Sequence, residues 1–223
     1  ASESLFDFGT HILPSFLRDS ESEPIKKAES PYGNTKQIGE EIIKDLVNSS
    51  SNFNAISLRY FNPIGAHPSA LIGELPIGIP QNLVPYITQT AIGKRNELTV
   101  FGDNYLTRDG SCIRDYIHVV DLAKAHIKSL EKLIKESSKN YYDAFNIGTG
   151  KGTSVLELIS CFESVSGKKL NFRIGERRKG DIAKCFADVS KANELLNWKS
   201  KHSIEDALLS SWNWEKHIKN EKL

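Results

Sequence analysis

The stretch Ser30-Pro31-Tyr32-Gly33-Asn34-Thr35-Lys36 places a tyrosine and a lysine four residues apart at the predicted start of a helix. Ser30 suits the N-cap position and Pro31 suits the first helical turn. Residues four apart share one helix face, so we expect Tyr32 and Lys36 to point into the same cleft. A lysine ammonium beside a phenol favours the phenolate. The pair is therefore a candidate general base, able to take a proton from a hydroxyl group.

The hydrophobic pattern around this stretch predicts the next elements. The first helix is expected to run to about Val47, with an apolar side formed by Ile38, Ile42, Ile43 and Leu46. A strand is expected at residues 55–61, a long loop rich in proline and glycine at 62–86, and short strands at 98–101 and 113–118. Asp121 is expected to cap a helix whose apolar face consists of Ala123, Ile127, Leu130 and Ile134.

The second half of the chain continues the alternation of strands and helices. A buried strand is expected at residues 144–147, and Ser154 with Glu157 forms a capping box that starts a helix ending at Gly167. A strand at 170–174 follows, and Ser203 with Asp206 opens the last helix. Strands alternate with helices along the chain, so the fold class is α/β.

The composition excludes several classes of function. The chain has 223 residues, 39% of them hydrophobic and 26% charged, and a net charge of +1, so nothing suggests binding to nucleic acid or to a membrane. Three cysteines without a CxxC pair favour free thiols, and no signal peptide or membrane-length apolar run is visible. We therefore expect a cytoplasmic protein. The six histidines show no metal-ligand spacing, so no metal is expected.

Several separated blocks resemble the sugar-nucleotide epimerases of the extended short-chain dehydrogenase/reductase family, and within it the UDP-glucose 4-epimerases. The blocks are SPYGNTK (30–36), LRYFNPIGAHPSALIGE (58–74), GIPQNLVPY (78–86), VFGDNY (100–105), IRDYIHVVDLAKAH (113–126), FNIGTGKGTSV (145–155) and RRKGD (177–181). The resemblance implies a partial Rossmann-type parallel sheet, its C-terminal half, with a smaller substrate-binding lobe. Residues 1–61 would then belong to the NAD-binding domain with the catalytic helix, and residues 62–223 mainly to the UDP-sugar-binding lobe, with elements returning to the first domain.

One departure from the family pattern concerns the glycine-rich turn that binds a dinucleotide. That turn should follow the first strand of such a chain, and none is present early in this sequence. The run from Gly148 to Gly152 lies between a strand and a helix and mimics the turn, but the resemblance gives it another loop role. We therefore expect a chain that lacks the first four or so strands, which carry the adenosine and pyrophosphate contacts in the family.

The resemblance implies catalytic roles for three residues and a cofactor role for a fourth. Tyr32 would be the general base, Lys36 would hold the ribose of NAD and keep the tyrosine acidic, and Tyr60 would lie near the nicotinamide. Ser4 takes the place of the family's catalytic serine, although Glu3, Asp7 and Phe8 replace the residues usual around it. The plainer alternative is a surface tyrosine and lysine on an amphipathic helix.

The resemblance also implies a set of substrate-binding residues. Asn62 and Asn82 would bind the phosphates, Thr99 and Phe101 the uracil, Arg114 and Arg178 the diphosphate, and Asp181 the ribose, with Tyr116 beside them. Cys185 matches a position that lines the 2-position of the sugar, and a residue this small there would leave room for UDP-N-acetyl sugars. A packed core thiol is the alternative for Cys185, and a solvated charge run is the alternative for residues 177–179.

The implied reaction interconverts UDP-galactose and UDP-glucose through oxidation and re-reduction at C4 of the sugar by NAD. A homodimer is expected, since family members pair through the helix that carries the tyrosine. Two alternatives remain open at this point. One is a non-catalytic UDP-sugar-binding or regulatory protein that lacks the dinucleotide-binding half. The other is a related decarboxylase or 4,6-dehydratase, although a dehydratase should carry an Asp-Glu pair where this chain has Ser4-Leu5.

Overall fold

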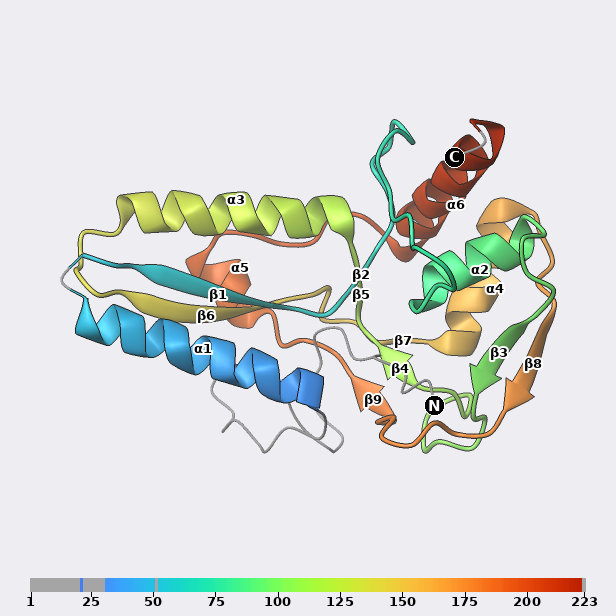
Figure 1. Cartoon of the computed structure of the whole chain (residues 1–223), viewed down its shortest axis with the longest axis horizontal. Helices are drawn as coiled ribbons and strands as arrows, with labels where there is room; N and C mark the ends of the chain where they lie inside the picture. The colour runs from blue at the N-terminus through green and yellow to red at the C-terminus, as the bar shows by residue number, and fades with distance from the viewer. Residues whose placement is uncertain (1–20, 22–30, 51, 222–223) are drawn as a thin grey trace.

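The computed structural model describes residue 21, residues 31–50 and residues 52–221. Helices and strands alternate along this part of the chain, and the α/β class predicted from the sequence is confirmed (Figure 1). The helices are α1 (Pro31–Ser49), α2 (Leu83–Ala91), α3 (Val119–Lys135), α4 (Val155–Ser166), α5 (Ser190–Leu195) and α6 (Ile204–Asn220). The strands are β1 (Ala55–Tyr60), β2 (Asn62–Ile64), β3 (Leu98–Phe101), β4 (Ile113–Arg114), β5 (Tyr116–His118), β6 (Tyr142–Ile147), β7 (Thr153–Ser154), β8 (Phe172–Gly175) and β9 (Lys184–Cys185).

One group of elements is built on the parallel pair β1 and β6, whose register runs from Ala55 opposite Tyr142 to Tyr60 opposite Ile147. Helices α1 and α3 lie on opposite sides of this pair, as in a Rossmann-type layer (Figure 1). Phe145 and Ile147 are fully buried in the core of this group. Both strands end on the side that faces the remaining elements, and the N-termini of α1 and α3 lie at that end.

The other group packs α2, α4 and α6 against the parallel pair β3 and β8 (Figure 1). Its core centres on Leu158, Phe162 and Leu208, and the Phe162 ring meets the Trp212 ring edge-on with centroids 5.8 Å apart. The capping box predicted at the start of α4 is present, and Gly167 ends α4 in the left-handed conformation that favours glycine. Ser203 and Asp206 open α6 as predicted, and they form a second capping box.

The strand predicted at residues 113–118 is two strands with different partners. β4 pairs with β7 and β9, whereas β5 pairs with β2, and Asp115 separates them. The Asp115 side chain is fully buried and accepts hydrogen bonds from Thr149, Gly150 and the backbone of Ala187. The sequence of residues 113–118 does not reveal this break, because the break arises from partners distant in sequence.

Two helix faces differ from the prediction. α3 is capped by His118, and Asp121 lies in its first turn, where its buried carboxylate accepts from the backbone N–H groups of Lys201 and His202. The prediction that Asp121 caps the helix was therefore wrong. The prediction of its buried face was also wrong. The buried side chains are those of Leu122, Ala125 and Ser129. The side chains predicted to be buried are exposed, namely Ala123, Ile127, Leu130 and Ile134.

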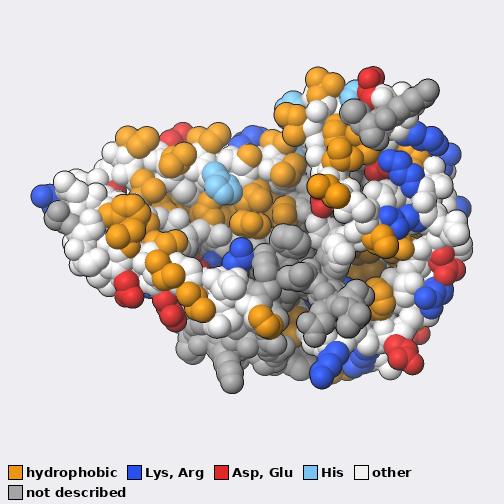
Figure 2. Space-filling model, in the orientation of Figure 1, with side chains coloured by type: hydrophobic (Ala, Val, Ile, Leu, Met, Phe, Trp, Pro, Cys, Tyr) orange, Lys and Arg blue, Asp and Glu red, His pale blue; other side chains and the backbone are white. Residues whose placement is uncertain are grey.

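α1 runs two residues beyond its predicted end and turns Val47 fully inward. Three of the four side chains predicted for its apolar side, Ile38, Ile42 and Leu46, are exposed. Figure 2 shows hydrophobic side chains gathered over α1, β1 and α3 on the face that it presents. Hydrophobic periodicity therefore predicted the positions of α1 and α3 correctly, but it did not predict which face of each helix packs on the strands.

The remaining boundaries shift by a few residues. The loop predicted at 62–86 begins with the short strand β2 and ends in the first turn of α2, and the strand predicted at 170–174 lies at Phe172–Gly175. None of the helices in the described part of the chain is long and apolar enough to cross a membrane. The proposed division of the chain at residue 61 stays a prediction.

Candidate functional site

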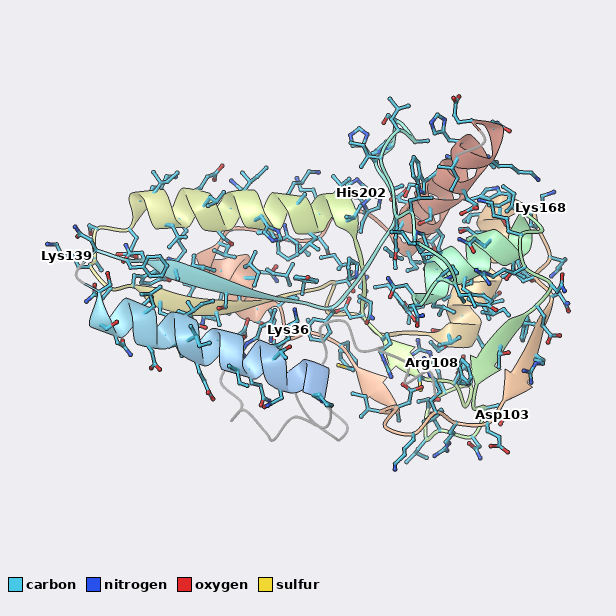
Figure 3. The ribbon with its side chains drawn as sticks, viewed as in Figure 1. Lys36, Asp103, Arg108, Lys139, Lys168 and His202 are labelled. Atoms are coloured by element: carbon cyan, nitrogen blue, oxygen red, sulfur yellow. The ribbon has the colours of Figure 1, made fainter. Side chains whose placement is uncertain are left out.

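The predicted catalytic pair lies on the first two turns of α1. Tyr32 and Lys36 belong to the same helix, the side chain of Tyr32 lies outside the described atoms, and Lys36 is exposed. Figure 3 shows Lys36 near the end of α1 that faces the second group of elements. The carboxyl ends of β1 and β6 lie at the same end, which is the usual place for ligands in parallel sheets. Ser4 falls outside the described residues.

Tyr60 and Asn62 end β1 and begin β2, so both lie at this edge of the strands. The Asn62 backbone N–H donates to the carbonyl of Asp115, and its side-chain oxygen Oδ1 is buried without a hydrogen-bond partner among the described residues. A buried acceptor without a donor is costly, so this oxygen is a candidate ligand contact. Tyr116 lies opposite Asn62 in the β2–β5 pairing. Burial raises the pKa of Tyr116 to about 12, although the nearby Arg114 opposes the shift.

Four predicted residues from three parts of the chain form a charged cluster. The Arg178 guanidinium lies 4.7 Å from the centre of the Phe101 ring and donates to the Asp181 carboxylate over 3.0 Å. The other oxygen of Asp181 lies 3.6 Å from Nη2 of Arg114. The Arg114 and Asp181 side chains are 14% and 15% exposed, so the two charges are largely shielded from water. Two guanidinium groups on either side of one carboxylate leave a net positive charge that suits a diphosphate.

Backbone contacts fix the orientation of Arg114. Its Nη1 donates to the carbonyls of Ile113 and Ile182 over 2.9 and 2.8 Å. Burial alone would lower the pKa of Arg114, but neighbouring acidic groups, above all Cys112 and Asp181, hold it above its ordinary value. Cys185 lies opposite Arg114 in the β4–β9 pairing and is 2% exposed. The predicted sugar-lining residue and the predicted diphosphate ligand are therefore neighbours in one small sheet.

The other predicted substrate residues come from separate elements. Thr99 lies on β3 two residues before the exposed ring of Phe101, and its methyl group would stand 2.7 Å from a Cβ placed on Gly175. Asn82 occupies the N-cap position of α2, but its side chain does not cap the helix. Instead, its Nδ2 donates to Glu74 over 2.7 Å. Desolvation raises the pKa of the Glu74 carboxyl, and the bond from Asn82 opposes that shift.

The glycine-rich loop at 148–152 is closed around the Asp115 carboxylate. The N–H groups of Thr149 and Gly150 donate to Asp115 over 2.9 and 3.0 Å, so they are not free to hold a phosphate. A Cβ on Gly148 would come within 2.5 Å of an Asp115 oxygen, which explains the need for glycine there. Burial raises the pKa of Asp115, and the hydrogen bonds from Thr149 are the largest opposing contribution. A buried acid in its centre makes this loop unsuited to a dinucleotide, as the resemblance implied.

A hollow of about 510 Å³ is lined by residues 102–104 and 173–177, and none of the predicted binding residues is among them. The Arg114–Asp181–Arg178 cluster has the charge and the directed donors that a nucleotide needs, so we take it as the candidate site. No group of three or more metal-ligating side chains gathers within the described residues.

Comparison with known proteins places the chain in a family. Residues 14–210 match the family model described as GDP-mannose 4,6 dehydratase. The chain is 51% identical over 188 residues to the UDP-glucose 4-epimerase of Bacillus subtilis (strain 168), a match that covers 84% of this chain and 55% of that protein. It is 46% identical over 207 residues to the UDP-glucose 4-epimerase of Drosophila melanogaster, covering 93% of this chain and 59% of that protein. The chain thus spans little more than half the length of these relatives.

Two solved structures have the same fold over the shared region. The UDP-glucose-4-epimerase of Stenotrophomonas maltophila, bound to NAD and formylated UDP-arabinopyranose, matches with a TM-score of 0.84 at 47% identity, covering 87% of this chain and 57% of that one. The UDP-glucose 4-epimerase of Bifidobacterium longum, in complex with NAD+ and UDP, matches with a TM-score of 0.85 at 44% identity, covering 93% and 61%. The chain therefore belongs to the GDP-mannose 4,6-dehydratase family, and its relatives within that family include UDP-glucose 4-epimerases.

Proposed function

We propose that this chain contributes the catalytic helix and the UDP-sugar-binding residues of a UDP-glucose 4-epimerase, which interconverts UDP-galactose and UDP-glucose. The observation that carries the proposal is the cluster of Arg114, Asp181, Arg178 and Phe101. Residues predicted from separate blocks of sequence to bind one nucleotide lie within contact distance of one another. The similarity to epimerases over most of this chain supports the same conclusion.

Each member of the cluster has a role that suits its chemistry. The guanidinium groups of Arg114 and Arg178 bind the diphosphate, because a planar fork of N–H donors matches phosphate oxygens. Asp181 accepts from the ribose hydroxyls and, before the nucleotide binds, holds both arginines in place. Phe101 presents an apolar ring to the uracil, with Thr99 beside it on β3. Asn82 and the unpaired side-chain oxygen of Asn62 provide further polar contacts.

The proton transfer is assigned to α1. Tyr32 takes the proton from the 4-hydroxyl of the sugar, and the ammonium of Lys36 favours the tyrosinate. Their position at the carboxyl ends of β1 and β6 fits a nicotinamide bound beside Tyr60, and NAD bound there supplies the hydride acceptor. The serine that would assist Tyr32 is Ser4. Two solved relatives are bound to NAD, which supports this cofactor for the epimerase.

Two finer features belong to the same proposal. Cys185 is small and lies beside Arg114, so we expect the pocket to admit UDP-N-acetyl sugars; the UDP-Glc/GlcNAc 4-epimerase of Campylobacter jejuni is 34% identical over the shared fold. The exposed stripe of Ile38, Ile42 and Leu46 on α1 supports a homodimer formed through this helix. The three free thiols suit the reducing conditions of the cytoplasm.

A titration of the chain with UDP tests the proposal. We expect calorimetry to show saturable binding of UDP. Arg178→Ala should weaken this binding at least tenfold, because it removes one of the two guanidinium groups that bind the diphosphate. Equal affinities of the two proteins would refute the assignment of the cluster. A chain that binds UDP but never converts UDP-galactose in the presence of NAD would favour the second candidate, a UDP-sugar-binding protein. The specific observation in favour of that candidate is that the charged cluster does not include α1.

A further inference from the structure

The segment that carries Arg178 and Asp181 connects β8 to β9, and we call residues 176–183 the strap. Its two ends are held by strand pairing, β8 with β3 and β9 with β4. Between these ends the strap carries two consecutive arginines, which lie on two different aromatic rings. Arg178 lies on Phe101 at the end of β3, and Arg177 lies on Tyr105 in the turn that follows. Only Arg178 was assigned a role from the sequence.

Arg177 makes three contacts with the 102–105 turn. Its Nε donates to the side-chain oxygen of Asn104 over 2.6 Å, and its Nη2 donates to the backbone carbonyl of the same residue. Its guanidinium carbon lies 4.1 Å from the centre of the Tyr105 ring. A forked pair of donors combined with a flat stacking surface is an arrangement that arginine can make and lysine cannot.

The backbone of the turn is shaped to receive this side chain. Gly102 has a φ of +83°, and a Cβ at this position would come within 2.7 Å of both Arg177 and Tyr105. The Gly102 N–H donates to the carbonyl of Gly175, the last residue of β8, over 2.9 Å. Figure 3 labels Asp103 in this turn, beside the ends of β3 and β8. Position 102 therefore has no room for a side chain beside Arg177 and Tyr105, which explains the need for glycine there.

We propose that Arg177 is a positioning residue for nucleotide binding. By fastening the strap to the 102–105 turn, it holds the neighbouring Arg178 over Phe101 and against Asp181, 3.0 Å away, ready to receive a nucleoside diphosphate. Without this attachment the strap must be ordered when the ligand binds, and that ordering lowers the affinity. The inference rests on the proposed function, in which Arg178 and Asp181 bind UDP.

The test is a calorimetric titration of the full chain with UDP, comparing wild type with Arg177→Ala, Arg177→Lys and Arg173→Ala. We expect both Arg177 variants to raise the Kd for UDP about tenfold, since each loses the forked contact. Arg177→Lys keeps the positive charge but loses the forked contact with the turn. If this variant bound UDP as tightly as wild type, the charge of residue 177 alone would account for its effect on UDP binding, and the inference would be overturned. Arg173→Ala is the matched control: it removes one charge from β8, where Arg173 pairs with Glu97 over 2.9 Å, and should leave the Kd unchanged.

A second ligand separates positioning from general damage to the fold. Uridine lacks the diphosphate that Arg178 binds, so we expect its affinity to change less than that of UDP in the Arg177 variants. Equal losses for the two ligands would overturn the inference. So would an Arg177→Ala protein that binds UDP as tightly as wild type while Arg178→Ala does not, although the proposed function would then stand. A wild-type chain that does not bind UDP would instead refute the proposed function itself.

Discussion

Replacement of Asp115 by alanine should destabilise the fold more than any surface substitution, because this one carboxylate satisfies donors from two separate segments. It is fully buried and accepts from the backbone N–H groups of Thr149, Gly150 and Ala187, and from the Thr149 hydroxyl. An orphaned buried N–H costs about 1–3 kcal/mol, so three of them cost about 3 kcal/mol even at the low end. For a chain of this length we expect the melting temperature to fall by about 6–12 °C.

Asp115→Asn provides a graded comparison. Its carbonyl oxygen can take the place of Oδ2 and accept from Gly150 and Ala187, while its amide can donate to the Thr149 hydroxyl. About one hydrogen bond is then lost, so we expect a cost of about 1 kcal/mol. Asp45 on the exposed side of α1 is the control, and its replacement by alanine should change stability by less than about 0.5 kcal/mol. Urea unfolding measures all three, and equal midpoints for Asp115→Ala and Asp45→Ala would refute this reasoning.

Three further predictions concern specificity, acid stability and assembly. Cys185→Tyr should lower the turnover of UDP-N-acetyl sugars relative to that of UDP-glucose in an active epimerase. An unchanged ratio of the two turnover rates would contradict the proposal that the small Cys185 leaves room for the N-acetyl group. Burial alone would raise the pKa of Asp121, but the N–H groups of His202 and Lys201 outweigh it and hold the pKa below its ordinary value of 3.8. The unfolded chain then binds more protons in acid, so stability should fall as the pH drops below about 4, and urea midpoints should fall less steeply for Asp121→Asn. Ile42→Glu on α1 should convert a homodimer to a monomer in size-exclusion chromatography, and an unchanged elution volume would place the interface elsewhere.

The sequence predicts local features of this fold well where the controlling interactions are local. The capping boxes of α4 and α6 and the glycine that ends α4 depend on residues within a few positions of one another, and all three are present. Hydrophobic periodicity located α1 and α3 but assigned the wrong faces, because it records which side chains are apolar and not what covers them. Asp115 was not predicted to split a strand, because its partners lie 34 and more residues away.

The candidate site divides in the same way. Motif resemblance identified Phe101, Arg114, Arg178 and Asp181, which lie together in the structure. It did not identify Glu74 or Arg177, whose relevance arises only from tertiary contacts with Asn82 and with the 102–105 turn. The glycine at position 102, directly after a strand, was the one sequence signal of a close approach there.

A structure of the chain with UDP bound tests the central claim most directly. The account predicts the diphosphate between the guanidinium groups of Arg114 and Arg178, the ribose at Asp181 and the uracil beside Phe101. UDP seated instead in the hollow of about 510 Å³ lined by residues 102–104 and 173–177, away from those four side chains, would contradict it.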